Sequence, residues 1–500
     1  MTPATVRMLV LAVLVAAATA RAHAAGDCEQ LLDLKLTDAH IETAAYIEAP
    51  VPHCKATGAI GGKVGFSVWL PTAENWNGRF LMGGAGGFVR AEDNQAMRYM
   101  GDAVLTRGYA TASSDTGHKG DGLDNSWALN DWEAIVNYGH LGMHRTVTTV
   151  KAVISGYYAK PTSKSFFIGC SNGGRQALQE AQRYPQDFDG IIAGAPSLDF
   201  TGVTAGFLNI TRHMYPDPGM LSDPLISSAD RKLLRAAIEA KCDTLDGVAD
   251  GILHNPSKCD FDVNTLQCAA QQVEGCLSKA KMAAIQAIYH GPHDVSGALH
   301  YGYPFGAEDL DTNGWGSWFT RAQVPNSDTQ APNAAYAFAM GFMRHFVFHD
   351  PAWNYSGYDW NNFRKDTAPI AAVVNAANPD LSAFRAKGGK LMMFHGWADV
   401  ALSAHMSTSY VEDVYARDPS ARDDVKLFMM PGVLHCFGGE GPSIVDWVQA
   451  LEDWHDSGIA PAKLTATYPD KAGARTVCAW PREARFTAGN PDTPEAYVCE

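Results

Sequence analysis

Beyond its first 25 residues the chain lacks long apolar runs, and it lacks basic clusters throughout. No later stretch reaches 18 apolar residues without a charge, so we expect no membrane span. The chain has 39 Lys and Arg against 54 Asp and Glu, a formal net charge of −15, and no basic run longer than a few residues. A phosphate-binding face needs clustered Lys and Arg, which excludes nucleic acid as the main partner.

The chain also lacks internal repeats and low-complexity linkers, which excludes a collagen-like chain and a coiled coil. What it has is 46 % apolar and 10 % aromatic residues over 500 positions, enough for a large core. This length fits two to four domains, or one large α/β core with an insertion. No feature of the sequence indicates an oligomeric state.

Residues 1–25 have the organisation of a secretory signal peptide. Arg7 supplies a positive charge, residues 8–20 are mostly Leu, Val and Ala, and residues 22–24 form a small-x-small cleavage site. The apolar stretch is too short for a membrane anchor. We therefore predict an exported protein, periplasmic or extracellular.

All ten cysteines follow this segment, where export permits oxidation. Eight of them are near neighbours, which favours the bonds Cys28–Cys54, Cys242–Cys259, Cys268–Cys276 and Cys478–Cys499. Cys170 and Cys436 are left over, far apart in the sequence. Spacing alone does not fix the connectivity, and any single cysteine can also be a buried thiol.

Strand-like and helical patterns alternate along most of the chain. Short apolar runs predict strands at 64–70, 79–82, 109–113, 165–168, 190–193, 390–394 and 425–430. Helical patterns cover 132–158, 174–184 and 444–454. Strands alternating with helices form a mostly parallel sheet covered on both faces, so the predicted fold class is α/β.

The alternation stops between about residues 200 and 377, in a stretch with four cysteines, an Asp-rich loop and many aromatic residues. These aromatics are Trp315, Trp318, Phe319, Tyr336, Phe338, Phe342, Phe346, Trp353, Tyr358 and Trp360. We predict a catalytic domain formed by 26–199 and 378–500, interrupted by an inserted lid domain at 200–377.

The sequence GCSNGG at residues 169–174 lies between a predicted strand and a predicted helix. A serine on a sharp strand-to-helix turn is the nucleophile elbow of a hydrolase sheet, with Ser171 at its apex. Side chains at Gly169 and Gly173 would obstruct the close approach of strand and helix. The alternative is an ordinary glycine-rich turn in which the serine only caps the helix.

A serine hydroxyl needs a base, and the chain order in such sheets is serine, acid, histidine. Asp399 and His435 each follow a predicted strand, at the strand ends where these sheets build their sites. His395 competes with His435, but its place in the Asp399 loop suits a supporting role. Glu412 and Asp413 compete with Asp399, but we assign them to a solvated helical face.

An oxyanion formed at Ser171 requires two N–H donors. One is the backbone N–H of Asn172, the residue after the nucleophile. The other comes from the glycine-rich loop after the strand at 79–82, where Gly86 and Gly87 are equal candidates.

The Cys-Ser pair at 170–171, Asp399 and the His-Cys pair at 435–436 together resemble the tannase and feruloyl esterase family of α/β-hydrolases. The resemblance covers nearly the whole chain after residue 25. It implies an α/β-hydrolase fold with a lid domain, a Ser-Asp-His triad, a disulfide between Cys170 and Cys436, and a calcium ion bound in the lid. That disulfide would hold the nucleophile and base loops side by side.

The family also includes a mono(2-hydroxyethyl) terephthalate hydrolase, to which the sequence is similar with one departure. Asn172 stands where that enzyme has Glu. Its carboxylate-binding arginine has no matched position here, and Arg321 and Arg344 are only nearby options.

The Asp-rich loop follows Cys242 and resembles the calcium loop of the family's lid. Its three carboxylates repel one another unless a cation is present, and calcium binds six to eight oxygen ligands. The alternative is a solvated acidic turn. We predict a structural Ca²⁺ held by carboxylates and backbone carbonyls of Asp243, Asp246, Val248, Asp250 and Ile252.

The predicted activity is that of a secreted serine carboxylic ester hydrolase, of feruloyl esterase or tannase type, acting on small esters of aromatic acids. Ser171 attacks the ester, His435 takes its proton and Asp399 orients the imidazole, giving an acyl-enzyme. The alternatives are an esterase like the terephthalate hydrolase, a serine peptidase on the same fold, and a calcium-stabilised binding protein without catalysis.

Overall fold

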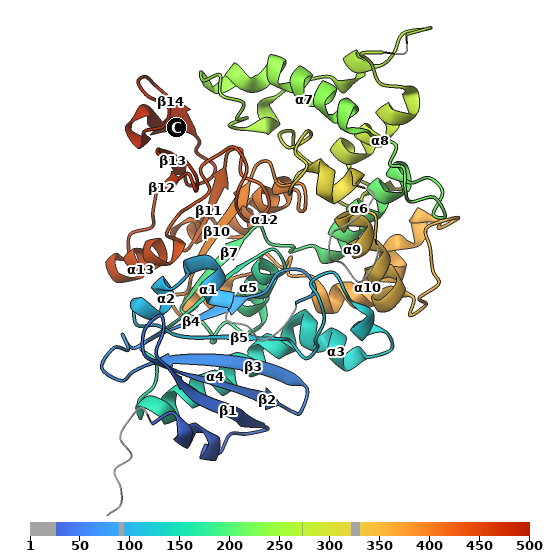
Figure 1. Ribbon diagram of the computed structural model, residues 1–500. Helices are drawn as coiled ribbons and strands as arrows, with labels where there is room; N and C mark the ends of the chain where they lie inside the picture. The colour runs from blue at the N-terminus through green and yellow to red at the C-terminus, as the bar shows by residue number, and fades with distance from the viewer. Residues whose placement is uncertain (1–26, 90–94, 273, 322–330) are drawn as a thin grey trace, which may run out of the picture.

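The computed structural model describes residues 27–89, 95–272, 274–321 and 331–500 (Figure 1). The predicted signal peptide at 1–25 lies outside the described residues. Across the described ranges, no helix is both long and apolar enough to cross a membrane.

A nine-stranded sheet runs through the described structure (Figure 1). In spatial order its strands are β1 (Ala39–Ile47), β2 (His53–Ile60), β3 (Val64–Pro71), β5 (Ala110–Ser114), β4 (Arg79–Gly84), β6 (Lys164–Cys170), β7 (Gly190–Gly194), β10 (Lys390–Gly396) and β11 (Val425–Met430). Pairs from β1 to β5 are antiparallel, and those from β5 to β11 are parallel. The predicted mostly parallel sheet is confirmed, with each predicted strand end within two residues of the observed one.

The edge strand β1 and its neighbour β2 were not predicted from the sequence. β1 buries only Ile41 among its nine residues, so its sequence shows no alternation of apolar and polar positions. β2 alternates in burial, but several of its inward residues are small, Ala56 among them. Strands with so few large buried residues carry too little hydrophobic signal for a pattern to reveal them.

Helices cover both faces of the sheet, and successive strand residues pack into opposite cores. In β6, Phe167 belongs to one core, while Phe166 and Ile168 belong to the other. The first core is closed by α4 (Gly142–Tyr158), α5 (Asn172–Arg183) and α12 (Ala404–Arg417). The second is closed by α1 (Gln95–Met100), α2 (Ala103–Thr106) and α13 (Trp447–Ser457).

The helix predicted over 132–158 is confirmed in extent, but it is not a regular α-helix throughout. The chain forms α3 (Trp132–Val136), a π-helical turn at 137–141 and then α4. The buried Arg175 guanidinium donates hydrogen bonds to the carbonyls of Tyr138 and Gly139 in that turn, at 2.9 and 2.6 Å. These carbonyls serve α5 rather than a regular helical ladder, which periodicity does not reveal.

Between β7 and β10 the described chain adds no strand to the main sheet. It forms α6 (Phe200–Met214), α7 (Ser228–Cys242), α8 (Lys279–His290), a hairpin of β8 (His293–Asp294) and β9 (Gly297–Ala298), α9 (Ala334–Phe342), α10 (Phe363–Val374) and α11 (Ser382–Ala386). Figure 1 shows α7 and α8 at the opposite end of the molecule from β1 and β2. Helices α6, α9 and α10 share the α4–α5 core, and the boundaries of a lid at 200–377 stay a prediction.

Two hairpins complete the chain, β12 (Lys463–Thr467) with β13 (Ala474–Cys478) and β14 (Ala484–Phe486) with β15 (Tyr497–Cys499). The structure contains five disulfides, which join the pairs Cys28–Cys54, Cys170–Cys436, Cys242–Cys259, Cys268–Cys276 and Cys478–Cys499. These are the four pairs favoured by spacing and the fifth implied by the family resemblance.

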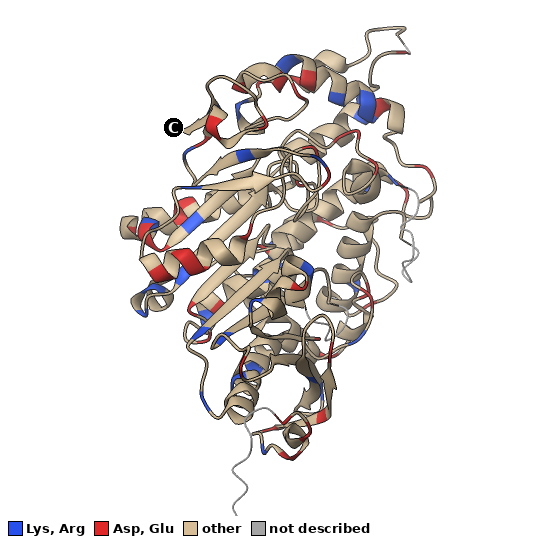
Figure 2. Ribbon diagram, turned by 60° about the vertical axis from the view of Figure 1, so that its left-hand side comes forward, with Lys and Arg blue, Asp and Glu red and all other residues tan. Residues whose placement is uncertain are grey.

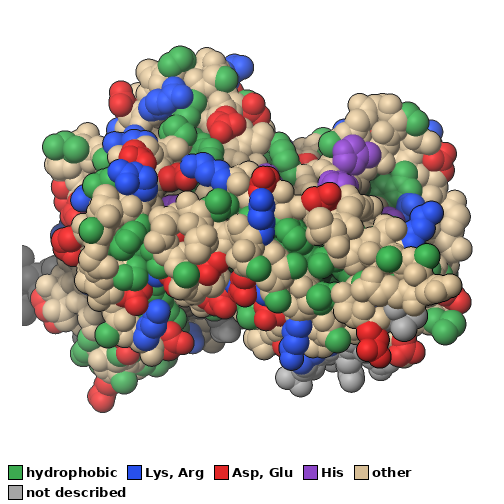
Figure 3. Space-filling model, turned by 90° about the horizontal axis from the view of Figure 1, so that it is seen from above, with side chains coloured by type: hydrophobic (Ala, Val, Ile, Leu, Met, Phe, Trp, Pro, Cys, Tyr) green, Lys and Arg blue, Asp and Glu red, His purple; other side chains and the backbone are tan. Residues whose placement is uncertain are grey.

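Charged residues lie mainly on helices and loops around the sheet, while its central strands carry few (Figure 2). Seen from above, acidic and basic side chains are interspersed among apolar ones (Figure 3). This face carries no continuous basic field of the kind that binds a polyanion.

Candidate active site

Ser171 lies between β6 and α5 in a backbone conformation that residues other than glycine rarely adopt, with φ 65° and ψ −127°. Its N–H donates to the carbonyl of Gly194 on β7 at 3.0 Å, and its carbonyl accepts from the N–H of Arg175 at the same distance. These bonds fix the turn from both sides, which is the geometry of a nucleophile elbow.

The glycines beside Ser171 are required by close packing. A Cβ on Gly169 would lie 2.4 Å from the carbonyl oxygen of Gly173, and one on Gly173 would lie 2.6 Å from that of Gly84. Both distances are well inside contact range, so strand, helix and glycine-rich loop can meet only without side chains here.

His435 and Asp399 are paired at the ends of adjacent parallel strands. Nδ1 of His435 lies 2.8 Å from Oδ2 of Asp399. An ionised carboxylate only accepts, so Nδ1 carries the hydrogen and Nε2 of the neutral ring is free to take a proton. His435 and Ser171 line the same cavity, which brings together the three residues predicted for the triad.

Asp399 is 1 % exposed and is held ionised by its partners. Burial by itself raises its pKa, but the charge of His435 and hydrogen bonds from His395 and His435 outweigh this, so the pKa lies well below its ordinary value. The N–H groups of Ala401 and Leu402 donate to its Oδ1 at 2.8 and 2.9 Å.

His395 supports Asp399 rather than replacing His435. Its Nε2 lies 3.2 Å from Oδ2 of Asp399 and 3.1 Å from the carbonyl of Leu402. Both are acceptors, so Nε2 carries the hydrogen and Nδ1 accepts from the Ser407 hydroxyl at 2.8 Å. The rival carboxylates Glu412 and Asp413 are exposed on α12, as expected.

The Cys170–Cys436 disulfide ties the residue before the nucleophile to the residue after the base. Its two Cα atoms are 6.0 Å apart, although 266 residues separate them in the sequence. Cys436 has φ 68°, and Ser171, which follows Cys170, has φ 65°. The backbone therefore turns sharply on both sides of the disulfide. The disulfide limits how far the Ser171 and His435 loops can separate.

The glycine-rich loop after β4 approaches the nucleophile at Gly86, where an added Cβ would lie 3.9 Å from Cβ of Ser171. Gly87 has φ 60°, and a Cβ there would lie 2.4 Å from the Gly122 carbonyl. The N–H of Gly86 and that of Gly87 have no acceptor within the described ranges, which leaves both able to serve an oxyanion. Asn172 begins α5, so its N–H also has no partner inside the helix.

Two amide side chains of α5 hold this loop from below. Asn172 Nδ2 donates to the carbonyl of Ala85 at 3.0 Å, and Gln176 Oε1 accepts from the Ala85 N–H at 3.2 Å. The partly buried Tyr99 adds a third link, donating to the Gly84 carbonyl and accepting from the Cys170 N–H. Sequence analysis missed Gln176 and Tyr99, because an isolated Gln or Tyr carries no recognisable motif.

Two cavities adjoin at Ser171, and Gly87, Trp318 and Phe338 line both. The larger, about 370 Å³, also contains Gln95, Arg98 and Asn313. The smaller, about 30 Å³, is lined mostly by apolar side chains, Phe200, Val203, Phe207, Ala401 and Leu402. The Trp318 ring stands edge-on to His435, with 5.8 Å between ring centres.

Neither Arg321 nor Arg344 lines these cavities. Arg344 instead donates from Nε to the carbonyl of Trp353 at 2.8 Å. Among the described residues, the arginine at the larger cavity is Arg98, which the sequence did not single out because α1 has only six residues and carries no recognisable motif.

The Asp-rich loop wraps its carboxylates around its own backbone. Asp243 accepts from the N–H of Gly251 at 2.8 Å, Asp246 from that of Val248 at 2.9 Å, and Asp250 from that of Ile252 at 3.1 Å. Arg475 of β13 also pairs with Asp250. The carbonyls of Val248 and Ile252 accept no hydrogen bond within the part of the chain that the structure describes.

Asp246 gives the clearest sign that this loop fits a cation. Its Oδ2 is buried without a hydrogen-bond partner, and the nearest histidine nitrogen, on His254, is 4.0 Å away. Burial and the nearby Asp250 and Asp243 raise the pKa of Asp246 to about 6. Hard oxygen donors with one orphaned oxygen and two free carbonyls are compatible with calcium.

A second group with metal-ligand chemistry lies away from the active site. Three side chains there, His144, Glu180 and Asp187, offer ligand atoms within 4.8 Å of one another. Among the described residues no other group of three His, Cys, Asp or Glu side chains brings its ligand atoms this close together. Lys151 donates to the backbone carbonyl of Asp187, and its ammonium charge acts on Glu180. Burial and the neighbouring Asp187 nevertheless raise the pKa of Glu180 well above its ordinary value, so a protonated Glu180 relieves the repulsion between the two carboxyl groups without a metal.

A family pattern and individual relatives point to the same protein family. The sequence pattern of the family described as "Tannase and feruloyl esterase" matches residues 50–500. A "Probable feruloyl esterase" from Arthroderma benhamiae is 32 % identical over 88 % of this chain and 83 % of its own length. The mono(2-hydroxyethyl) terephthalate hydrolase of Piscinibacter sakaiensis is 31 % identical over 92 % of this chain and 87 % of its own length.

The fold agrees with that of a solved relative. The crystal structure of feruloyl esterase B from Aspergillus oryzae superimposes with a TM-score of 0.82 at 23 % identity, covering 94 % of this chain and 98 % of that one. The predicted α/β-hydrolase architecture is therefore confirmed.

Proposed function

Because the chain belongs to the tannase and feruloyl esterase family, and so is a carboxylic ester hydrolase, we propose that it cleaves esters of aromatic acids through a Ser171-Asp399-His435 triad. The observation that carries this proposal is the 2.8 Å pairing of His435 Nδ1 with Asp399 on the cavity that contains Ser171. This pairing leaves the basic nitrogen of the imidazole for the serine.

In the first half-reaction Ser171 Oγ forms a bond to the ester carbonyl carbon and its proton passes to His435 Nε2. Negative charge develops on the carbonyl oxygen, where the N–H of Asn172 and one from Gly86 or Gly87 stabilise it, each by about 3–4 kcal/mol. His435 then protonates the departing alcohol oxygen. Water repeats the sequence on the acyl-enzyme and releases the acid.

An ester bound at Ser171 extends into both cavities. The small apolar cavity suits the ring edge of the aromatic acyl group, because Phe200, Phe207 and Leu402 offer no charge to it. The larger cavity suits a polar alcohol, since Gln95 and Arg98 supply hydrogen-bond donors.

We also propose a structural calcium ion at the loop of Asp243, Asp246, Val248, Asp250 and Ile252. The orphaned Oδ2 of Asp246 supports it. Bound calcium supplies positive charge that offsets the three carboxylates. Export to the periplasm or beyond the cell is part of the same proposal, and five disulfides support it.

The test combines active-site labelling with a substrate panel. A fluorophosphonate probe should label the wild type and the Ser296→Ala control, which lacks an exposed serine, but not Ser171→Ala. Methyl ferulate, methyl gallate and mono(2-hydroxyethyl) terephthalate at equal concentration then rank the acyl groups. Labelling that survives Ser171→Ala would refute the assignment of the nucleophile.

A further inference from the structure

The small cavity beside Ser171 contains one polar group that nothing in the protein satisfies. Ser197 lines this cavity and is 4 % exposed. Its hydroxyl has no hydrogen-bond partner among the described residues. A buried hydroxyl left unpaired is costly, so a ligand that pairs with it is favoured over one that does not.

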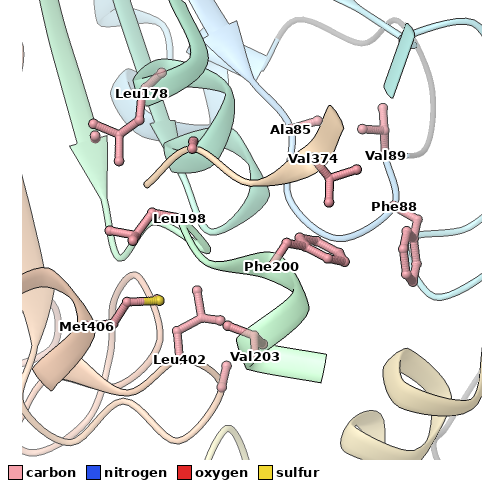
Figure 4. Close-up of a cluster of buried hydrophobic side chains, with 14 of the residues drawn as sticks. Ala85, Phe88, Val89, Leu178, Leu198, Phe200, Val203, Val374, Leu402 and Met406 are labelled. Carbon is pink, nitrogen blue, oxygen red and sulfur yellow. The ribbon is translucent and has the colours of Figure 1, made fainter. Parts of the chain in front are cut away.

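The neighbouring hydroxyl in the same cavity is different. Thr204 Oγ1 donates to the carbonyl of Phe200 at 3.0 Å, one turn earlier in α6. The rest of the lining is apolar, and Figure 4 shows Phe200, Val203 and Leu402 gathered around the start of α6. Ser197 is therefore the polar side chain of this lining, other than the catalytic loop, that remains available to a substrate.

The backbone places Ser197 close to the reacting ester. Its N–H donates to the carbonyl of Ser171 at 3.2 Å, in the loop that follows β7. The cavity volume of about 30 Å³ admits about two groups the size of a water molecule. Its occupant is thus the far edge of a ring with its substituents, which passes Trp318 and Phe338, the two aromatic residues that line both cavities.

We propose that the Ser197 hydroxyl forms a hydrogen bond with a ring hydroxyl of the acyl group, and that it selects hydroxybenzoyl esters. In a hydroxybenzoyl ester the ring is attached directly to the reacting carbonyl. Its ring hydroxyl therefore stays near Ser171, as does Ser197, whose backbone is hydrogen-bonded to that of Ser171. In a hydroxycinnamoyl ester a two-carbon spacer carries the ring hydroxyl further away. This inference rests on the proposed esterase function and names the acyl class within it.

The experiment compares kcat/KM for methyl 4-hydroxybenzoate, methyl gallate, methyl benzoate and methyl ferulate in the wild type and Ser197→Ala. Each variant-to-wild-type ratio cancels the intrinsic reactivity of its ester. We expect the two hydroxybenzoates to lose about tenfold relative to methyl benzoate, as for loss of one buried hydrogen bond. Methyl ferulate should follow methyl benzoate.

Thr204→Val is the matched control, because it removes an already satisfied hydroxyl from the same cavity and should change all four esters by a similar factor. Ser197→Cys, which preserves size with a weaker donor, should fall between wild type and Ser197→Ala. Thermal melting of each variant establishes that it is folded.

A uniform loss across the four esters, or a selectivity change in Thr204→Val equal to that in Ser197→Ala, would overturn the hydrogen bond. A larger loss on ferulate than on the hydroxybenzoates would overturn the acyl class. Failure of the proposed function looks different, because the wild type would then hydrolyse none of the four esters.

Discussion

The active site and the Asp-rich loop both gather acidic side chains, but they are held in different ways. Asp399 follows the parallel strand β10 and is fixed by two histidines and two backbone N–H groups. Asp243, Asp246 and Asp250 lie in irregular chain and mainly cap their own neighbours. The sheet fixes the geometry of the active site. The Asp-rich loop depends instead on local turns, on the Cys242–Cys259 disulfide that closes a short loop, and on the proposed ion.

The largest expected effect separates the two regions by function. Asp399→Asn should lower kcat/KM by about 10⁴-fold, because an amide favours the wrong imidazole tautomer and does not stabilise the imidazolium. Asp243→Asn should leave kcat nearly unchanged. Steady-state kinetics on one aromatic ester measures both, and similar losses in the two variants would contradict the separation.

The disulfides extend the comparison to stability. Replacing Cys170 and Cys436 by Ser should cost about 5–6 kcal/mol of unfolding free energy, because the closed loop is long, and should also lower kcat. Replacing Cys242 and Cys259 should cost about 3 kcal/mol and spare kcat. Denaturant unfolding and single-turnover kinetics test this. Unchanged kcat in a folded variant lacking Cys170 and Cys436 would show that the bond does not position the site.

Acid should destabilise the fold at the glycine-rich loop through His118. Nε2 of His118 is hydrogen-bonded to the Phe88 carbonyl of that loop, and its ring stacks on Trp127. Burial lowers its pKa to about 4. Below pH 6.5 the unfolded chain takes up this proton while the folded chain does not. The contribution of His118 to the free energy of unfolding, about 3 kcal/mol, is therefore complete above pH 6.5 and is lost as the pH falls toward 4.

Denaturant unfolding at pH 7 and pH 4.5 measures this loss. His118→Gln should reduce the difference in stability between the two pH values, while His293→Gln, which removes an exposed imidazole, should not. An equal pH dependence in wild type and His118→Gln would exclude His118 as its source.

Removing calcium should affect the Asp-rich loop and not the chemistry. An ion at 100 times its Kd contributes about 2.7 kcal/mol, so a chelator should lower the Tm by several degrees with kcat retained. The double variant Asp243→Asn/Asp246→Asn should melt at the lower temperature and no longer respond to the chelator. A wild-type Tm that is insensitive to thorough chelation would count against the site.

The smallest effect concerns the glycine-rich loop. Asn172→Ala keeps the backbone donor but releases the Ala85 carbonyl, and kcat should fall about tenfold with little change in KM. Gln182→Ala removes another amide of α5, whose partners are Ala376 and Tyr410, and should leave kcat unchanged. A change in KM alone would argue that Asn172 binds substrate rather than positioning the loop.

Sequence patterns reach the parts of the site that belong to regular structure. Ser171, Asp399 and His435 each follow a buried strand, so strand prediction and chain order were enough to propose them as a triad. His118, Gln176 and Tyr99 act through contacts between segments far apart in the sequence, which no periodicity encodes. β1 escaped prediction for a related reason, because an edge strand with one buried residue leaves almost no hydrophobic pattern.

The bond between Cys170 and Cys436 has a consequence for assembly. In the folded protein its two sulfurs lie together because β6, β7, β10 and β11, which come from either side of the long insertion, are neighbours in one sheet. Closure of this bond is therefore a covalent record that these four strands have paired, and a chain kept reduced would lack that record.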